Sequence, residues 1–142
     1  MKRLRLTTAL LALTIGFAHA HCQIPCGIYG DAARFETLQE HATTITKSLT
    51  EIKRLSTGPA NTNQSVRWVT NKEAHAQMIQ DIMGNYFLAQ RIKASQKDYT
   101  QRLVLAHTII VAAMKTKQSP ELAHADALVK AIEAFKVQYF SE

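Results

Sequence analysis

Hydrophobic residues recur at helical spacing along most of the chain after position 30. In the first run they step by three and four residues and so share one helix face, at Phe35, Leu38, Ala42, Ile45, Leu49 and Ile52. Asp31 stands just before this run and is a favourable N-cap residue. The pattern predicts a long amphipathic helix that begins beside Asp31.

Three more segments show the same periodicity. The pattern breaks over residues 56–63, where Gly, Pro and Asn are typical of a loop, and a second run then extends from Val66 to about Ile92. A third run follows from Tyr99 to Ala113. Ser119 and Pro120 match a helix cap followed by proline at the first helical position, and they predict a fourth helix that passes through Phe135.

Four amphipathic helices joined by short connections pack most readily as an antiparallel bundle. The sequence therefore predicts an all-α protein, an antiparallel four-helix bundle over about residues 31–140, with no strands and no glycine-rich phosphate loop.

The first 20 residues have a different pattern. A basic start precedes a mostly apolar stretch, and an Ala-x-Ala motif ends at Ala20, which is typical of a cleavable secretory leader. The apolar stretch is shorter than a membrane span. We expect residues 1–20 to be removed and residues 21–142 to form an exported, periplasmic or extracellular domain without a membrane anchor. The alternative is a cytoplasmic protein whose leader is removed by a protease.

Composition supports one small domain. The chain has 142 residues and a formal charge of +6, which falls to +3 without the three basic residues of the leader. This charge does not predict a nucleic-acid partner. The two cysteines are too few for a disulfide-rich scaffold.

Residues 21–29, His-Cys-Gln-Ile-Pro-Cys-Gly-Ile-Tyr, concentrate metal donors ahead of the first helix. Cleavage at the predicted site would bring the α-amine and imidazole of His21 next to the thiol of Cys22, and Cys26 adds a second thiol. Such a mixed nitrogen and sulfur set suits Ni(II) or Cu(II) better than Zn(II). A disulfide between Cys22 and Cys26, which would only staple a turn of a structural bundle, is the alternative, and their spacing alone does not separate the two.

The motif His-Cys-x-x-Pro-Cys-Gly-x-Tyr before a helical bundle resembles the nickel-containing superoxide dismutases. The segments 67–73 and 85–87 also look like segments of this family. The matching motif positions are His21, Cys22, Pro25, Cys26, Gly27, Tyr29 and, in the first helix, Glu36.

The resemblance implies an enzyme that converts superoxide to dioxygen and hydrogen peroxide by cycling between Ni(II) and Ni(III). It implies one nickel ion per chain, bound by His21, Cys22 and Cys26 in an N-terminal hook, and a homohexamer. In the family pattern the His21 imidazole is an axial ligand of the oxidised metal. Tyr29 would close the pocket beside the vacant axial face, and Tyr86 would support it from the second helix.

The resemblance also gives Glu36 the task of orienting the axial imidazole, together with a basic partner from the second helix. Arg67, Lys72 and His75 are all candidates for that partner. The segment between Tyr29 and Glu36 is one residue shorter than in typical members. A rival function is a non-catalytic periplasmic bundle that binds nickel or copper, or does thiol-redox chemistry, through the same ligands.

The histidines that follow the hook are expected at surface or boundary positions. They lack the repeated Glu-x-x-His pairs of a bundle-core metal site. These residues are His41, His75, His107 and His124.

Overall fold

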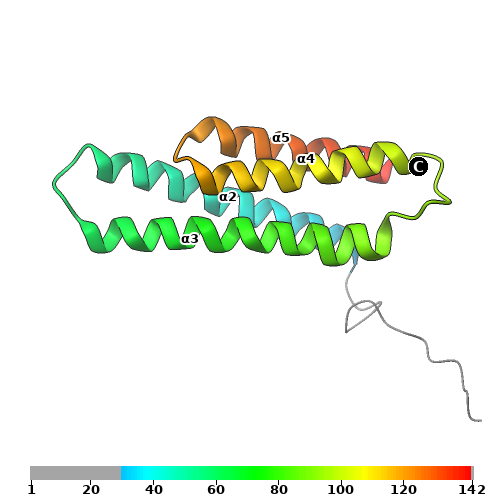
Figure 1. Cartoon of the computed structure of the whole chain (residues 1–142), viewed down its shortest axis with the longest axis horizontal. Coiled ribbons are helices and arrows are strands. Elements are labelled where there is room, and N and C mark those ends of the chain that lie inside the picture. The colour runs from blue at the N-terminus through cyan, green and yellow to red at the C-terminus, as the bar shows by residue number, and fades with distance from the viewer. Residues whose placement is uncertain (1–29, 142) are drawn as a thin grey trace, which may run out of the picture.

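The computed structural model describes residues 30–141, which form four long α-helices and one π-helical segment (Figure 1). In chain order the elements are α2 (Asp31–Ser56), α3 (Thr62–Asp81), η1 (Ile82–Arg91), α4 (Tyr99–Gln118) and α5 (Leu122–Phe140). No strand occurs in this part of the chain. The predicted all-α four-helix bundle is confirmed. The predicted leader and the hook residues 21–29 lie outside the described residues.

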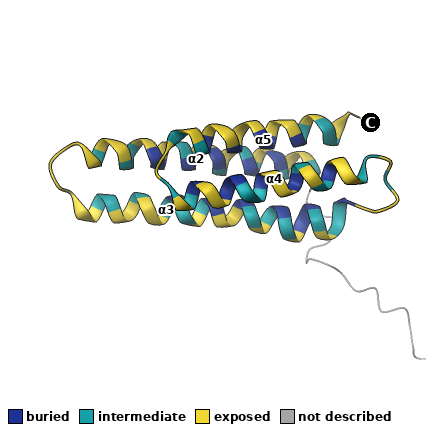
Figure 2. Cartoon of the chain, turned by 45° about the horizontal axis from the view of Figure 1, so that its top comes forward, coloured by how far each residue is buried: buried dark blue, intermediate teal, exposed yellow. Residues whose placement is uncertain are grey.

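The helices pack in a ring of antiparallel neighbours. α2 packs against α3 and α5, and α4 packs against the other side of the same two helices. The buried face that the periodicity predicted for α2 is observed at Phe35, Leu38, Ala42, Ile45 and Leu49. Buried residues follow the inward faces of the helices, and exposed residues cover the outside (Figure 2).

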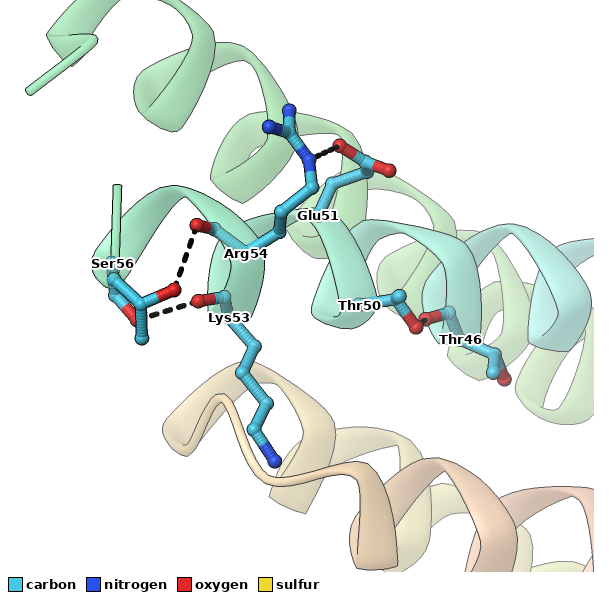
Figure 3. A network of polar contacts seen from close by, with 7 residues as sticks. Thr46, Thr50, Glu51, Lys53, Arg54 and Ser56 are labelled. Atoms are coloured by element: carbon cyan, nitrogen blue, oxygen red, sulfur yellow. Dashed lines mark hydrogen bonds and ion pairs between the residues drawn. The ribbon is translucent and has the colours of Figure 1, made fainter. Parts of the chain in front are cut away.

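The hairpin between α2 and α3 projects beyond the turn between α4 and α5 (Figure 1). Residues 50–71 contain no buried residue, since no other helix covers this arm. Instead, hydrogen bonds and an ion pair between nearby residues stabilise the C-terminal end of α2 (Figure 3). Ser56 Oγ donates to the Lys53 carbonyl over 2.8 Å, and Arg54 Nε pairs with Glu51 over 2.9 Å. The core, and with it most of the stability, therefore lies toward the other end of the bundle.

Two predicted helix caps are wrong. Gly30 is the N-cap of α2, and Asp31 is the first helical residue, whose carboxylate is hydrogen-bonded to side chains of η1 and α5. α5 begins at Leu122, two residues after Pro120. Ser119 instead ends α4, and its hydroxyl accepts a bond from the Glu121 N–H at 3.3 Å.

The second predicted helix is not one regular helix. Its last ten residues form the π-helix η1, in which hydrogen bonds join residues five apart. The Ile92 N–H continues this pattern by donating to the Phe87 carbonyl at 2.9 Å. Both side chains are buried, and the wider winding brings them to the same side of the segment.

None of the helices in residues 30–141 combines the length and apolar character needed to cross a membrane.

Candidate functional site

The chain joins the bundle at Gly30 and Asp31, directly after the hook residue Tyr29. Asp31 starts α2, and its acidic side chain is favoured in the first turn by the helix dipole. The start of α2 and the ends of η1 and α5 meet at this end of the bundle, since side chains of all three are hydrogen-bonded there. This is the described region nearest in sequence to the proposed metal ligands.

The Asp31 carboxylate binds three side chains from two other elements. Tyr86 of η1 donates its hydroxyl to Oδ1 at 2.5 Å, and Tyr139 of α5 donates its hydroxyl to Oδ2 at 2.9 Å. Arg91 Nε lies 2.8 Å from Oδ1, and Arg91 Nη2 donates to the Tyr86 hydroxyl oxygen at 2.9 Å. We call these four side chains the Asp31 cluster. The negative charge of Asp31 and the positive charge of Arg91 balance within it.

The environment keeps the phenols of this cluster protonated. Burial raises the pKa of Tyr86, the hydrogen bond to Asp31 raises it further, and Arg91 partly opposes both. Burial and the bond to Asp31 also raise the pKa of Tyr139 far above its ordinary range. The hydrogen bond to Tyr86 raises the pKa of Arg91, against the effect of burial. At neutral pH the cluster therefore holds two neutral phenols and one ion pair.

The π-helical winding brings Tyr86 and Arg91 together. In an α-helix, residues five apart are separated by about 140° around the axis, since each residue advances about 100°. In η1 the i to i+5 bonding places such residues above one another, and the Arg91 guanidinium carbon lies 5.0 Å from the centre of the Tyr86 ring. The irregular segment is thus what completes the cluster.

A second guanidinium approaches the same ring from α2. The guanidinium carbon of Arg34 lies 5.6 Å from the centre of the Tyr86 ring, so two cations from two elements lie near this phenol. Guanidinium groups beside a phenol favour the approach of a small anion.

Glu36 does not join the Asp31 cluster. It is exposed on α2 and lines a shallow surface hollow with Gln39, Glu40, Thr43 and Thr44. Its predicted task concerns the imidazole of His21, which lies outside the described residues, and stays a prediction.

The three basic candidates for the Glu36 partner have other surroundings. The amine of Lys72 is buried and donates to the Lys117 carbonyl at 2.8 Å. His75 is hydrogen-bonded to His41. Arg67 lines a hollow on the arm of α3, away from the start of α2. Among the ion pairs of residues 30–141, none joins Glu36 to any of these side chains.

His41, His75, His107 and His124 lie at exposed or half-buried positions, as predicted, with one addition. They lie on four different helices, and no three potential metal-binding side chains gather anywhere in the described residues. His41 and His75, however, form a direct contact across α2 and α3 with their Nδ1 atoms 2.9 Å apart. The sequence pattern did not pair them.

Sequence reasoning identified Tyr86 but missed its partners. Asp31 was interpreted only as a helix cap, and neither Arg91 nor Tyr139 was singled out. The regular helix predicted around position 90 would have turned Arg91 away from Tyr86. Tyr139 is more than 100 residues from Asp31 along the chain, and no local spacing relates the two.

The bundle and the donor-rich segment before it are those of an all-α metalloprotein. A family model described as nickel-containing superoxide dismutase matches residues 17–142, and the chain belongs to this family. It is accordingly an enzyme, an oxidoreductase that uses nickel and acts on superoxide. No curated protein and no solved structure matches the chain.

Proposed function

We propose that the chain dismutates superoxide at a single nickel ion held by His21, Cys22 and Cys26. The donor set supports this assignment, since an amine, an imidazole and two thiolates provide the nitrogen and sulfur ligands that suit nickel. The structural observation that carries the proposal is the position of Tyr86. Its hydroxyl is bound to Asp31, two residues after Tyr29, where the chain joins the bundle.

Nickel bound in this way supplies one-electron chemistry between Ni(II) and Ni(III), so that one superoxide is oxidised to dioxygen and the next, with two protons, is reduced to hydrogen peroxide. Anionic sulfur donors favour the higher oxidation state and bring the potential into the useful range.

The remaining residues act around this centre. In this proposal Tyr29 and Tyr86 would line the side from which the substrate approaches, and Glu36 would orient the imidazole of His21, as metal-bound histidines usually require. The guanidinium groups near Tyr86 favour approach of the superoxide anion.

The proposal requires a free α-amine on His21. We therefore propose that residues 1–20 are removed as an export leader, and that the mature protein acts outside the cytoplasm as a homohexamer. The predicted cleavage motif supports the first point, and the family resemblance supports the hexamer. Cell fractionation and light scattering of the mature protein test these two points.

The decisive experiment determines the mature N-terminus and the bound metal together. Intact mass and elemental analysis of the natively produced protein should show a chain that begins at His21 with one nickel ion. A retained leader, or a metal-free chain two hydrogen masses lighter than expected, would favour a Cys22 to Cys26 disulfide.

Variants then assign the ligands. C22S and C26S should each lose nickel and activity, while Q23A, a change within the same hook, should keep both. A variant that retains Ala20 before His21 should be inactive, because the α-amine becomes an amide. Full activity of that variant would refute the proposed coordination.

A further inference from the structure

The Asp31 carboxylate has a role that neither the family match nor the sequence motif assigns. We propose that Asp31 is a positioning residue that fixes the direction of the Tyr86 hydroxyl, and that Tyr139 holds Asp31 in place from α5. This inference rests on the proposed function, in which Tyr86 lies beside the metal hook.

Two hydrogen bonds of Tyr86 show how its hydroxyl group is fixed. A tyrosine hydroxyl has one proton to donate and can accept through its oxygen. Tyr86 gives its proton to Asp31 and accepts from Arg91, so both directions are defined by charged partners. Bonds to charged groups are shorter and stronger than neutral ones. A reacting anion therefore meets a phenol whose proton already points to Asp31.

Asp31 is itself held from two sides. Tyr139 occupies Oδ2, so the carboxylate cannot rotate without losing a bond, and Arg91 lies against Oδ1. The ring of Tyr139 is anchored in turn by Phe35 and Phe87, at centroid distances of 5.4 and 5.5 Å. The orientation of one phenol is thus tied to the aromatic core of the bundle.

Asp31 lies next to the hook in the sequence but is not one of the proposed metal ligands. Only Gly30 separates it from Tyr29, so the residue that fixes Tyr86 also begins the helix to which the hook is attached. A change in Asp31 alters the phenol without touching any proposed metal ligand. This makes its effect separable from nickel binding.

The first test uses the nickel-free chain. Titration of the tyrosine ring carbons by NMR should show a lower pKa for Tyr86 in D31N than in the unaltered protein, because an anionic acceptor is lost. Y139F should also shift the Tyr86 titration, by a smaller amount. The matched control is D81N, which removes the same charge from an exposed aspartate of α3 that is bonded to Gln77. Equal Tyr86 titrations in D31N and D81N would overturn the proposal.

The second test is a double-mutant cycle on the nickel-loaded enzyme. D31N should lower kcat several-fold with nickel content unchanged, and should have less than a twofold effect when Tyr86 is already replaced in Y86F. An equal loss in both backgrounds would show that Asp31 does not act through Tyr86. If D31N does not fold, the same cycle is carried out with Y139F.

The two proposals fail in different ways. Activity that is unchanged in Y86F would refute the role given to Tyr86 under the proposed function. The titration of the nickel-free chain would still decide whether Asp31 controls that phenol.

Discussion

The imidazoles of His41 and His75 face each other between α2 and α3, with 2.9 Å between their Nδ1 atoms. The rings meet edge to face with their centroids 4.9 Å apart. At this distance one nitrogen must donate a proton and the other must accept it, so the contact cannot survive when both rings are charged. Two helices are therefore joined by a bond that depends on protonation.

The contact between His41 and His75 predicts that the free energy of unfolding falls in acid. Burial lowers the pKa of His41, the neighbouring His75 lowers it further, and Glu40 partly opposes them. Because the folded state then binds fewer protons than the unfolded state, stability is complete above the ordinary histidine pKa of 6.5 and declines as the pH falls through that value toward the folded-state pKa. Denaturant unfolding from pH 8 to pH 5 measures this. H41Q should flatten the profile, whereas the same change at the exposed His107 should leave its slope intact.

Phe35 links the core to the site. Its ring packs against Phe87 and Phe135 at centroid distances of 4.9 and 5.4 Å, one turn after Asp31. F35A should lower the free energy of unfolding by about 3–5 kcal/mol, because a large buried ring leaves a cavity. Chemical denaturation tests this against V66A, whose side chain is exposed and should cost less than about 0.5 kcal/mol. Similar losses in both variants would contradict the assigned core.

Lys72 is a buried residue whose amine binds a backbone carbonyl in the last turn of α4. Its Nζ donates to the Lys117 carbonyl at 2.8 Å, near the C-terminus of α4, and lies 3.0 Å from Glu73. K72M keeps most of the apolar stem but removes the donor, and should cost about 1–3 kcal/mol of stability. K93M at an exposed position is the control. A more stable K72M would show that the cost of burying the charge exceeds the value of its bonds.

Nickel binding should order the proposed hook. A metal that joins His21, Cys22 and Cys26 restricts the chain between them, so amide exchange over residues 21–29 should slow when nickel is added to the mature chain. Hydrogen exchange with mass detection measures this, and α4 serves as the internal reference. Equal exchange with and without nickel would contradict this ligand set, and chelation should restore the faster rates.

The sequence predicted the regular parts of the fold well. Helical periodicity located all four helices, since each buries one apolar stripe, and residues such as Phe35, Leu38 and Phe135 lie in the core as expected. The helix starts were less predictable. Ser119 and Pro120 carry a strong capping signal, yet Ser119 ends one helix instead of beginning the next.

Of the candidate site, only part could be predicted. Tyr86 was found through the family pattern, whereas Asp31, Arg91 and Tyr139 were not assigned to any site. Asp31 and Tyr139 meet because α2 and α5 pack side by side, and Arg91 reaches Tyr86 because η1 winds as a π-helix.

The four amphipathic helices, the donors of residues 21–26 and the family resemblance can all be recognised from the sequence, because each depends on residues close together in the chain. Helix packing is what brings one carboxylate to two phenols and a guanidinium, and His41 to His75. Those contacts depend on the register and winding of helices that are distant in sequence, which no local pattern specifies. The proposed metal ligands are thus close together in the sequence, whereas the hydrogen bonds of the Asp31 cluster depend on helix packing.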